Sequence, residues 1–192
     1  MQQYFEVRWH GRGGQGAKTA ALLFGEAAME TGKYIQAFPE YGPERTGAPV
    51  KAFNRLSDGP IRIHTQVINP DVVVVLDASL LESINVTEGL KDNGALIVNT
   101  QEKAAAIKEK LRVTNAKVAV VDATKIAVEI LKKNVPNTVM LGAMVKITGV
   151  LEWDSALASI KEKLEVKFRG RTEIIEGNVE AIKRAYDEVE VA

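Results

Sequence analysis

Hydrophobic and polar residues alternate along the chain with two periods, one typical of strands and one typical of helices. Alternating or continuous apolar runs predict strands at residues 4–9, 34–38, 50–56, 61–67, 71–77, 95–100 and 117–122. Apolar residues at helical spacing predict helices at residues 17–31, 79–84, 101–111, 123–133, 137–151, 154–164 and 171–190. Because strands alternate with helices through most of the chain, we expect a three-layer α/β/α, Rossmann-like domain with a mostly parallel sheet.

The sheet is expected to be mixed, because one turn signal predicts an antiparallel pair. An Asp-Gly pair at 58–59 stands between the runs 50–56 and 61–67, a position typical of a β-hairpin. Within the second run, alternation places His64 on the same face as Arg62. That face is expected to meet solvent or a partner.

The pattern becomes purely helical after Pro136. Asn137 and Asp154 each precede an apolar periodic stretch and are predicted to cap its helix. We expect a helical extension over 136–192 that packs on an α/β body over 1–135, so that residues 1–192 form one domain.

Composition narrows the possible functions. Lys and Arg total 25 and so do Asp and Glu, so no net charge favours nucleic acid or an anionic membrane as a partner. The sequence has no cysteine, which excludes disulfides, thiolate nucleophiles and cysteine-held iron–sulfur clusters within this chain, and two histidines are too few for a Cys/His metal site. No apolar stretch approaches the roughly 20 residues of a membrane span, and the opening "MQQYFEVRW" lacks the apolar core of a signal peptide. We expect a cytoplasmic protein.

A glycine-rich loop, "GRGGQG" at 11–16, follows the first predicted strand and precedes the first predicted helix. Its glycines fit the dinucleotide motif G-x-G-x-x-G, but the nearest acidic residue for a ribose is Glu40, in a turn-prone stretch. A P-loop is disfavoured because Ala17 precedes Lys18, and one inserted residue turns a helical side chain by about 100°. The loop is thus either a tight structural turn or a site for a phosphate or carboxylate at a helix start.

A second unusual loop, "PEYGPERTGAPV" at 39–50, joins two predicted strands. It is longer than a simple connection needs, which favours a functional or interface role, although an ordered surface loop with an exposed Glu44–Arg45 pair explains it as well.

The two loops together resemble the gamma subunits of 2-oxoacid:ferredoxin oxidoreductases, and "GAPV" at 47–50 is similar to their pyruvate and branched-chain subgroups. The likeness continues through "VINPDVVVVLD" at 67–77, "NTVMLGAMVKITG" at 137–149 and "EGNVEAIKRAYDE" at 176–188. Thr46 departs from the basic residue expected at its position.

The resemblance implies a subunit of a complex that oxidatively decarboxylates pyruvate with coenzyme A to acetyl-CoA and CO2 and reduces ferredoxin. It implies alpha, beta and ferredoxin-like delta partners, which hold thiamine diphosphate, Mg2+ and [4Fe-4S] clusters, whereas this chain contributes no catalytic or metal-binding residue. The residues assigned to a possible phosphate or coenzyme A contact are Gly11, Arg12, Gly13, Gly14, Gln15 and Gly16. The residues assigned to an interface or ligand loop are Glu40, Tyr41, Gly42, Pro43, Glu44 and Arg45.

Three alternatives stay open. The same subunit role in a branched-chain 2-oxoacid enzyme is one, and a stand-alone module that binds coenzyme A or a nucleotide is the second. A nicotinamide-dependent oxidoreductase is the third, and it lacks an evident proton donor beside the loop. His10 adjoins the loop and is interpreted as a structural hydrogen-bonding residue. The carboxylates at the predicted strand ends, Asp71, Asp77 and Asp122, have no catalytic spacing.

Overall fold

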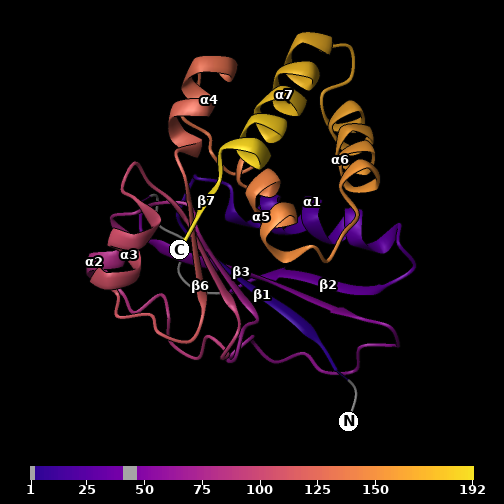
Figure 1. Ribbon diagram of the computed structural model, residues 1–192. Coiled ribbons are helices and arrows are strands. Elements are labelled where there is room, and N and C mark those ends of the chain that lie inside the picture. The colour runs from indigo at the N-terminus through magenta and orange to yellow at the C-terminus, as the bar shows by residue number, and fades with distance from the viewer. Residues whose placement is uncertain (1–2, 41–46) are drawn as a thin grey trace.

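A seven-stranded sheet forms the centre of the computed structural model, which describes residues 3–40 and 47–192 (Figure 1). The strands are β1 (Phe5–Arg12), β2 (Tyr34–Pro39), β3 (Pro49–Ser57), β4 (Val72–Val75), β5 (Ala95–Asn99), β6 (Lys117–Val121) and β7 (Glu190–Val191). Their order across the sheet is β2-β3-β1-β4-β5-β6-β7. β1, β4, β5 and β6 run parallel, whereas β3 is antiparallel to both of its neighbours and β7 is antiparallel to β6.

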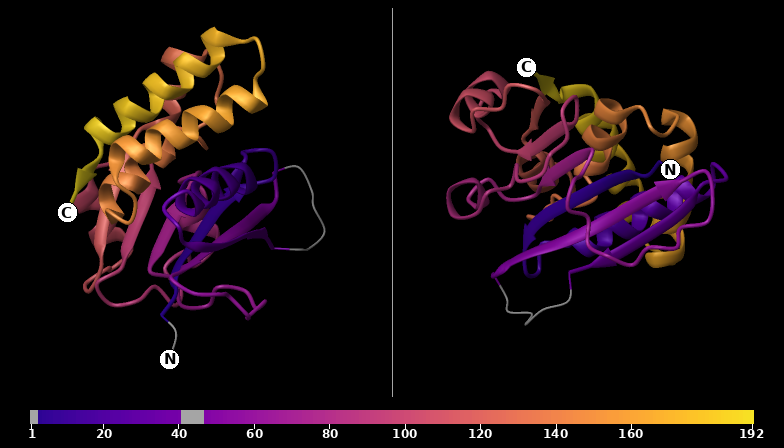
Figure 2. Two further views of the ribbon diagram at one scale, coloured as in Figure 1. Left: turned by 90° about the vertical axis from the view of Figure 1, so that its right-hand side faces the viewer. Right: turned by 90° about the horizontal axis from the view of Figure 1, so that it is seen from below.

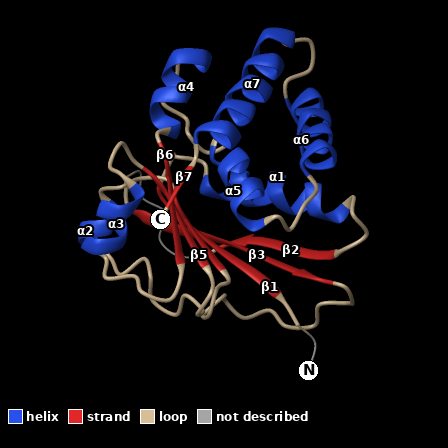
Figure 3. Ribbon diagram, in the orientation of Figure 1, coloured by secondary structure: helices blue, strands red, loops and turns tan. Residues whose placement is uncertain are grey.

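Helices cover both faces of the sheet (Figure 3). They are α1 (Ala17–Met29), α2 (Leu80–Ser83), α3 (Ala104–Lys110), α4 (Ala123–Leu131), α5 (Met140–Thr148), α6 (Trp153–Lys167) and α7 (Thr172–Glu188). The residues of β4 show the layering, because Val72 and Val74 pack under α1 and α4–α7 while Val73 and Val75 pack under α2 and α3. This arrangement confirms the predicted α/β/α class, the mostly parallel, mixed sheet and the C-terminal helical segment.

The C-terminal helices share one hydrophobic core with the sheet. Met140 and Met144 of α5, Ile160 of α6 and Ile182 of α7 are buried in the same cluster as Val74. α6 and α7 run side by side over the other elements of this layer (Figure 2). None of the helices among the described residues is long and apolar enough to span a membrane.

The predicted hairpin at 58–59 is wrong. Residues 61–67 form no strand, and His64 and Arg62 lie exposed on an irregular segment. The reason is that both hydrogen-bonding edges of β3 are already occupied, one by β1 and the other by β2. The sheet is therefore mixed because β3 runs antiparallel between β2 and β1 and β7 runs antiparallel to β6.

The caps of two C-terminal helices also differ from the prediction. α5 begins at Met140 with no side-chain cap, and the amide of Asn137 instead donates to the Gly16 carbonyl at 3.4 Å. The cap of α6 is Glu152, whose carboxylate accepts the N–H groups of Asp154 at 3.0 Å and of Ser155 at 2.8 Å.

The region after Pro136 is also not purely helical. The short strand β7 follows α7 and pairs with β6, with Glu190 opposite Val120 and Val191 opposite Ala119. Its carboxylate at Glu190 accepts the Ala104 N–H at 3.1 Å, so the end of the chain is attached to the start of α3.

Candidate functional site

The glycine loop lies at the point where the connections of the sheet change direction. The chain leaves β1 through α1 toward β2 and β3, whereas it leaves β4 through α2 toward β5 on the other side. In open α/β sheets, ligands bind in the crevice at the carboxyl ends of strands at such a switch point. β1 itself extends through Arg12, so the first two residues of the motif still belong to the strand.

Two glycines of the loop occupy backbone positions that require glycine. The Gln15 N–H donates to the Arg12 carbonyl at 3.0 Å, which closes a turn with Gly14 at its third position and a φ of +97°. Gly16 has a φ of +80°, and a Cβ there would lie 2.5 Å from Asn137 Nδ2. Asn137 therefore fills the space beside Gly16 and holds the end of the loop.

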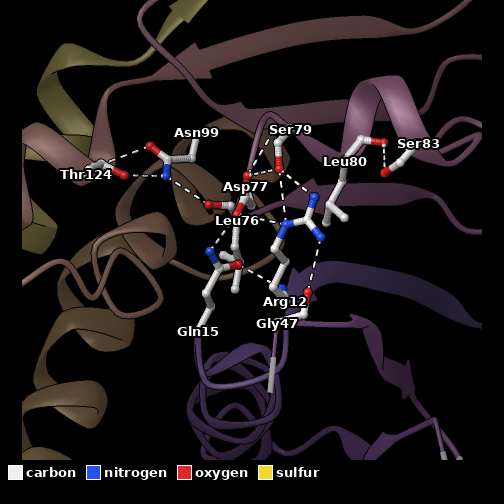
Figure 4. Close-up of polar contacts among 10 residues, drawn as sticks. All are labelled: Arg12, Gln15, Gly47, Leu76, Asp77, Ser79, Leu80, Ser83, Asn99 and Thr124. Atoms are coloured by element: carbon white, nitrogen blue, oxygen red, sulfur yellow. Dashed lines mark hydrogen bonds and ion pairs between the residues drawn. The ribbon is translucent and has the colours of Figure 1, made fainter. Parts of the chain in front are cut away.

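The side chains of Arg12 and Gln15 attach the loop to the segment after β4 (Figure 4). Gln15 accepts the Arg12 backbone N–H at 2.7 Å and donates to Asp77 at 2.6 Å, so both ends of its amide are satisfied. The Arg12 guanidinium donates to the Ser79 hydroxyl at 2.7 and 3.1 Å and lies 3.4 Å from the Asp77 carboxylate. The Ser79 hydroxyl in turn donates to Asp77 at 2.6 Å.

This set of contacts keeps Asp77 ionised. Partial burial disfavours the charged carboxylate, but hydrogen bonds from the Ser79 hydroxyl, Gln15 and the Ser79 backbone N–H outweigh burial, and the charge of Arg12 adds to them. The pKa of Asp77 is consequently below its ordinary value. With its oxygens accepting these bonds, Asp77 holds the loop in place and is poorly suited to act as a general base.

The start of α1 presents backbone donors that no residue within 3–40 and 47–192 accepts. The first backbone bond of the helix runs from the Ala20 N–H to the Gly16 carbonyl at 3.0 Å, so the N–H groups of Ala17, Lys18 and Thr19 precede it. Among the described residues no side chain caps this end. Free N–H groups at the positive end of a helix dipole favour an anion.

A hollow of about 430 Å³ opens between this helix start and the ends of the second loop. The residues that line it are Arg12, Gly13, Gly14, Gly16, Ala17, Lys18, Pro39, Glu40, Val50 and Lys51. Lys51 lies 3.5 Å from Glu40 across one wall. Apart from Arg12, whose guanidinium contacts Asp77 and Ser79, the charged side chains on these walls are the cations Lys18 and Lys51 and the carboxylate Glu40. With the N–H groups of the helix start, the two lysines suit an anionic group.

The structure brings the two motifs together at their described ends. The Gly13 N–H donates to the Ala48 carbonyl at 2.8 Å, and the Gly47 N–H donates to the Gly13 carbonyl at 3.2 Å. Glu40 directly follows β2, and the other residues assigned to this loop, Tyr41, Gly42, Pro43, Glu44 and Arg45, lie outside the described residues.

Glu40 does not occupy the position of the acidic residue in a dinucleotide-binding fold. That residue ends the second strand of a β-α-β unit that has its first two strands side by side. Here β3 lies between β1 and β2, so the strand that ends before Glu40 is not adjacent to the strand that carries the glycine loop.

The sequence patterns missed a second polar group at the same edge of the sheet. Asn99, at the end of β5, donates to the Leu76 carbonyl at 2.9 Å and to the Thr124 hydroxyl at 2.8 Å, and it accepts the Thr124 N–H at 3.1 Å (Figure 4). It therefore joins the ends of β4 and β5 to the start of α4. Asp122 caps α4 by accepting the Lys125 N–H at 2.9 Å.

His10 lies in β1, just before the glycine loop, and its contact is with another side chain of the same strand. It is 1% exposed, and its Nε2 accepts the Arg8 Nε–H at 3.0 Å. Within 3–40 and 47–192, no group of three or more His, Cys, Asp or Glu side chains is placed to hold a metal ion.

The fold and the loop define an open α/β protein with a glycine loop at the switch point of a mixed sheet. The chain matches the family "Pyruvate ferredoxin/flavodoxin oxidoreductase" over residues 6–188, and it belongs to that family. It is 50% identical over 188 residues to pyruvate synthase subunit PorC of Thermotoga maritima, covering 98% of this chain and 96% of the relative. It is 52% identical over 186 residues to the pyruvate/ketoisovalerate oxidoreductases common subunit gamma of Pyrococcus furiosus, covering 97% of each chain.

A solved structure supports the same assignment. The crystal structure of pyruvate oxidoreductase subunit PORC from Thermotoga maritima superimposes with a TM-score of 0.85 at 47% identity, covering 100% of this chain and 99% of the other. These matches confirm the gamma-subunit resemblance, so this chain is a subunit of a multi-subunit 2-oxoacid oxidoreductase.

Proposed function

We propose that this chain is the gamma subunit of a complex that converts pyruvate and coenzyme A to acetyl-CoA and CO2 and passes the two released electrons to ferredoxin. The similarity to a pyruvate synthase subunit over nearly the full length of both chains carries this proposal. A branched-chain 2-oxoacid is the second candidate substrate, because the name of the Pyrococcus furiosus relative joins pyruvate with ketoisovalerate.

The redox chemistry in this proposal belongs to other chains. The sequence has no cysteine to supply the thiolates of an iron–sulfur cluster. We assign thiamine diphosphate, Mg2+ and the [4Fe-4S] clusters to alpha, beta and ferredoxin-like delta subunits in a cytoplasmic complex. The isolated gamma chain is then inactive.

The glycine loop is assigned to coenzyme A within this complex. Coenzyme A carries a diphosphate and a further phosphate, and the hollow combines free N–H groups at a helix start with Lys18 and Lys51. In this assignment Gly13, Gly14 and Gly16 let the backbone approach the phosphate, and Glu40 on the facing wall belongs to the same site.

Purification from the native source through a tag on this chain tests the subunit assignment. We expect larger partner chains with bound thiamine diphosphate and iron–sulfur absorbance, and pyruvate- and coenzyme A-dependent reduction of ferredoxin. Activity with 3-methyl-2-oxobutanoate in place of pyruvate would identify the branched-chain enzyme. A tagged chain that is recovered alone and active would instead favour a stand-alone module.

The coenzyme A contact is tested with Lys18→Gln in the assembled complex. Losing the exposed cation of Lys18 should raise the KM for coenzyme A about fivefold to tenfold, equivalent to about 1 to 1.4 kcal/mol, with the KM for pyruvate unchanged. The matched control is Lys33→Gln, since Lys33 pairs with Asp58 at 2.8 Å near the opposite edge of the sheet. An unchanged KM for coenzyme A in Lys18→Gln would contradict the contact.

Calorimetry separates this site from a nicotinamide site. Because β3 lies between β1 and β2, Glu40 does not end the strand beside β1 as the acidic residue of a dinucleotide site does. We therefore expect little affinity for NAD and a weak, phosphate-dependent response to coenzyme A. Micromolar binding of NAD would overturn this ranking.

A further inference from the structure

Arg12 occupies a central place among the polar contacts of the site. It is the last residue of β1, and its guanidinium reaches two other segments of the chain. Toward the segment after β4 it contacts the Ser79 hydroxyl and the Asp77 carboxylate. Toward the second loop its Nη1 donates to the Gly47 carbonyl at 3.1 Å (Figure 4).

The groups that Arg12 contacts have their own orientations fixed. Ser79 accepts two bonds from the guanidinium, so its single hydroxyl hydrogen is left for Asp77 at 2.6 Å. Asp77 also accepts the Ser79 N–H at 3.0 Å and the Gln15 amide at 2.6 Å. The Arg12 and Asp77 side chains are 30% and 22% exposed, so the pair is shielded on most sides.

The contact with Gly47 adds to a backbone pair between the two loops. Gly13 and the segment 47–48 exchange two backbone hydrogen bonds, which prolong the β1–β3 ladder beyond Arg12 and Pro49. Two such bonds at the open end of a ladder fray readily. The guanidinium supplies a third link, anchored to the sheet through Asp77 and Ser79.

We propose that Arg12 is a positioning residue that holds the described end of the second loop, residues 47–48, against the glycine loop from an anchor at the end of β4. Its guanidinium is engaged with Asp77, Ser79 and Gly47 and does not serve as the phosphate ligand of the hollow. This positioning keeps both loops on one surface. The part of the inference that concerns coenzyme A rests on the proposed function.

Amide hydrogen exchange of the full chain tests the positioning directly. Arg12→Gln should accelerate exchange of the Gly13 and Gly47 N–H groups about fivefold to tenfold relative to the β4 amides, because the third link is lost. Arg12→Lys should show most of the same effect, since one ammonium cannot bridge Ser79 and Gly47 as a planar guanidinium does.

The matched control is Lys91→Gln. Lys91 pairs with Asp71 at 2.8 Å at the opposite end of β4, and its side chain and that of Asp71 are 38% and 29% exposed. This variant should leave exchange at Gly13 and Gly47 unchanged. Unchanged exchange at these two amides in Arg12→Gln, or acceleration of all amides alike, would overturn the inference.

Steady-state kinetics of the assembled complex separate this inference from the proposed function. Faster exchange in Arg12→Gln with a raised KM for coenzyme A and an unchanged kcat supports both. Faster exchange with an unchanged KM supports the positioning role and contradicts the coenzyme A contact. A raised KM with unchanged exchange means that Arg12 contacts the ligand itself, and it overturns the positioning role.

Discussion

His10 makes the stability of this protein sensitive to mild acid. Burial, the charge of Arg8 and the charge of Lys51 lower its pKa from 6.5 to about 3. The proton on the Arg8 Nε–H already points at His10 Nε2, so protonation of that nitrogen would place two donors face to face. The native state therefore keeps His10 neutral while the unfolded chain protonates it.

The size of the effect follows from proton linkage. A base whose pKa is lowered on folding loses stability as pH falls below the unfolded pKa, here 6.5, until it reaches the folded pKa of about 3. The free energy of unfolding should therefore be about 2 kcal/mol lower at pH 5 than at neutral pH. This value is the product of roughly 1.4 kcal/mol per pH unit and the one and a half units between pH 6.5 and pH 5. Carboxylates with lowered pKa values, such as Asp77, lose their contribution at still lower pH.

Urea unfolding at pH 7 and pH 5 measures this difference. His10→Gln keeps an acceptor within reach of the Arg8 Nε–H but cannot titrate, so it should lose about 2 kcal/mol less than the wild type between the two pH values. His64→Gln is the control, because His64 is exposed on an irregular segment, and it should follow the wild type. If His10→Gln lost as much stability as the wild type, a different group would be responsible.

Two further predictions concern stability. Glu152→Ala should lower the thermal midpoint of unfolding because two N–H groups of α6 lose their acceptor, whereas Asp154→Ala should change the midpoint little. Circular dichroism measures both midpoints, and equal losses would contradict the assignment of the cap. Gly142→Ala should destabilise the protein by about 3 kcal/mol, because its Cβ would lie 2.0 Å from the Ile182 carbonyl oxygen. Gly177→Ala should stay within about 1 kcal/mol of the wild type, because its Cβ would meet only side-chain atoms. Urea unfolding compares the two, and similar losses would show that α5 and α7 separate easily.

The strands and helices could be predicted because each has a local pattern. The apolar run before Asp77 gave β4, and the Ala-rich stretch after Gly16 gave α1. Caps were less predictable, since both Glu152 and Asp154 stand near the start of α6 and only the backbone path decides which carboxylate turns back toward the free N–H groups.

The two loops of the site could be predicted from the sequence, but the side chains that hold them together could not. The motif G-x-G-x-x-G treats Arg12 and Gln15 as variable, yet these are the side chains that attach the loop to Asp77 and Ser79. No spacing rule connects position 12 with position 79, because the contact exists only when β1 and β4 are neighbours. The carboxylate of Asp77, directly after the apolar run that forms β4, is the signal that could have located the anchor.

The wrong prediction of a hairpin at β3 also bears on why the two loops lie together. Pairing β3 with residues 61–67 would displace β1 or β2 from one of the two edges of β3, and the strand order that brings the second loop beside the glycine loop would be lost. With β3 inserted antiparallel between β2 and β1, β2 runs parallel to β1, so both strands end at the same edge of the sheet. The chain that leaves β2 must return along β1 to form β3, and it therefore passes the glycine loop at Gly47 and Ala48. The adjacency of the two motifs is thus a consequence of strand order, and Arg12 stabilises a contact that the topology has already made.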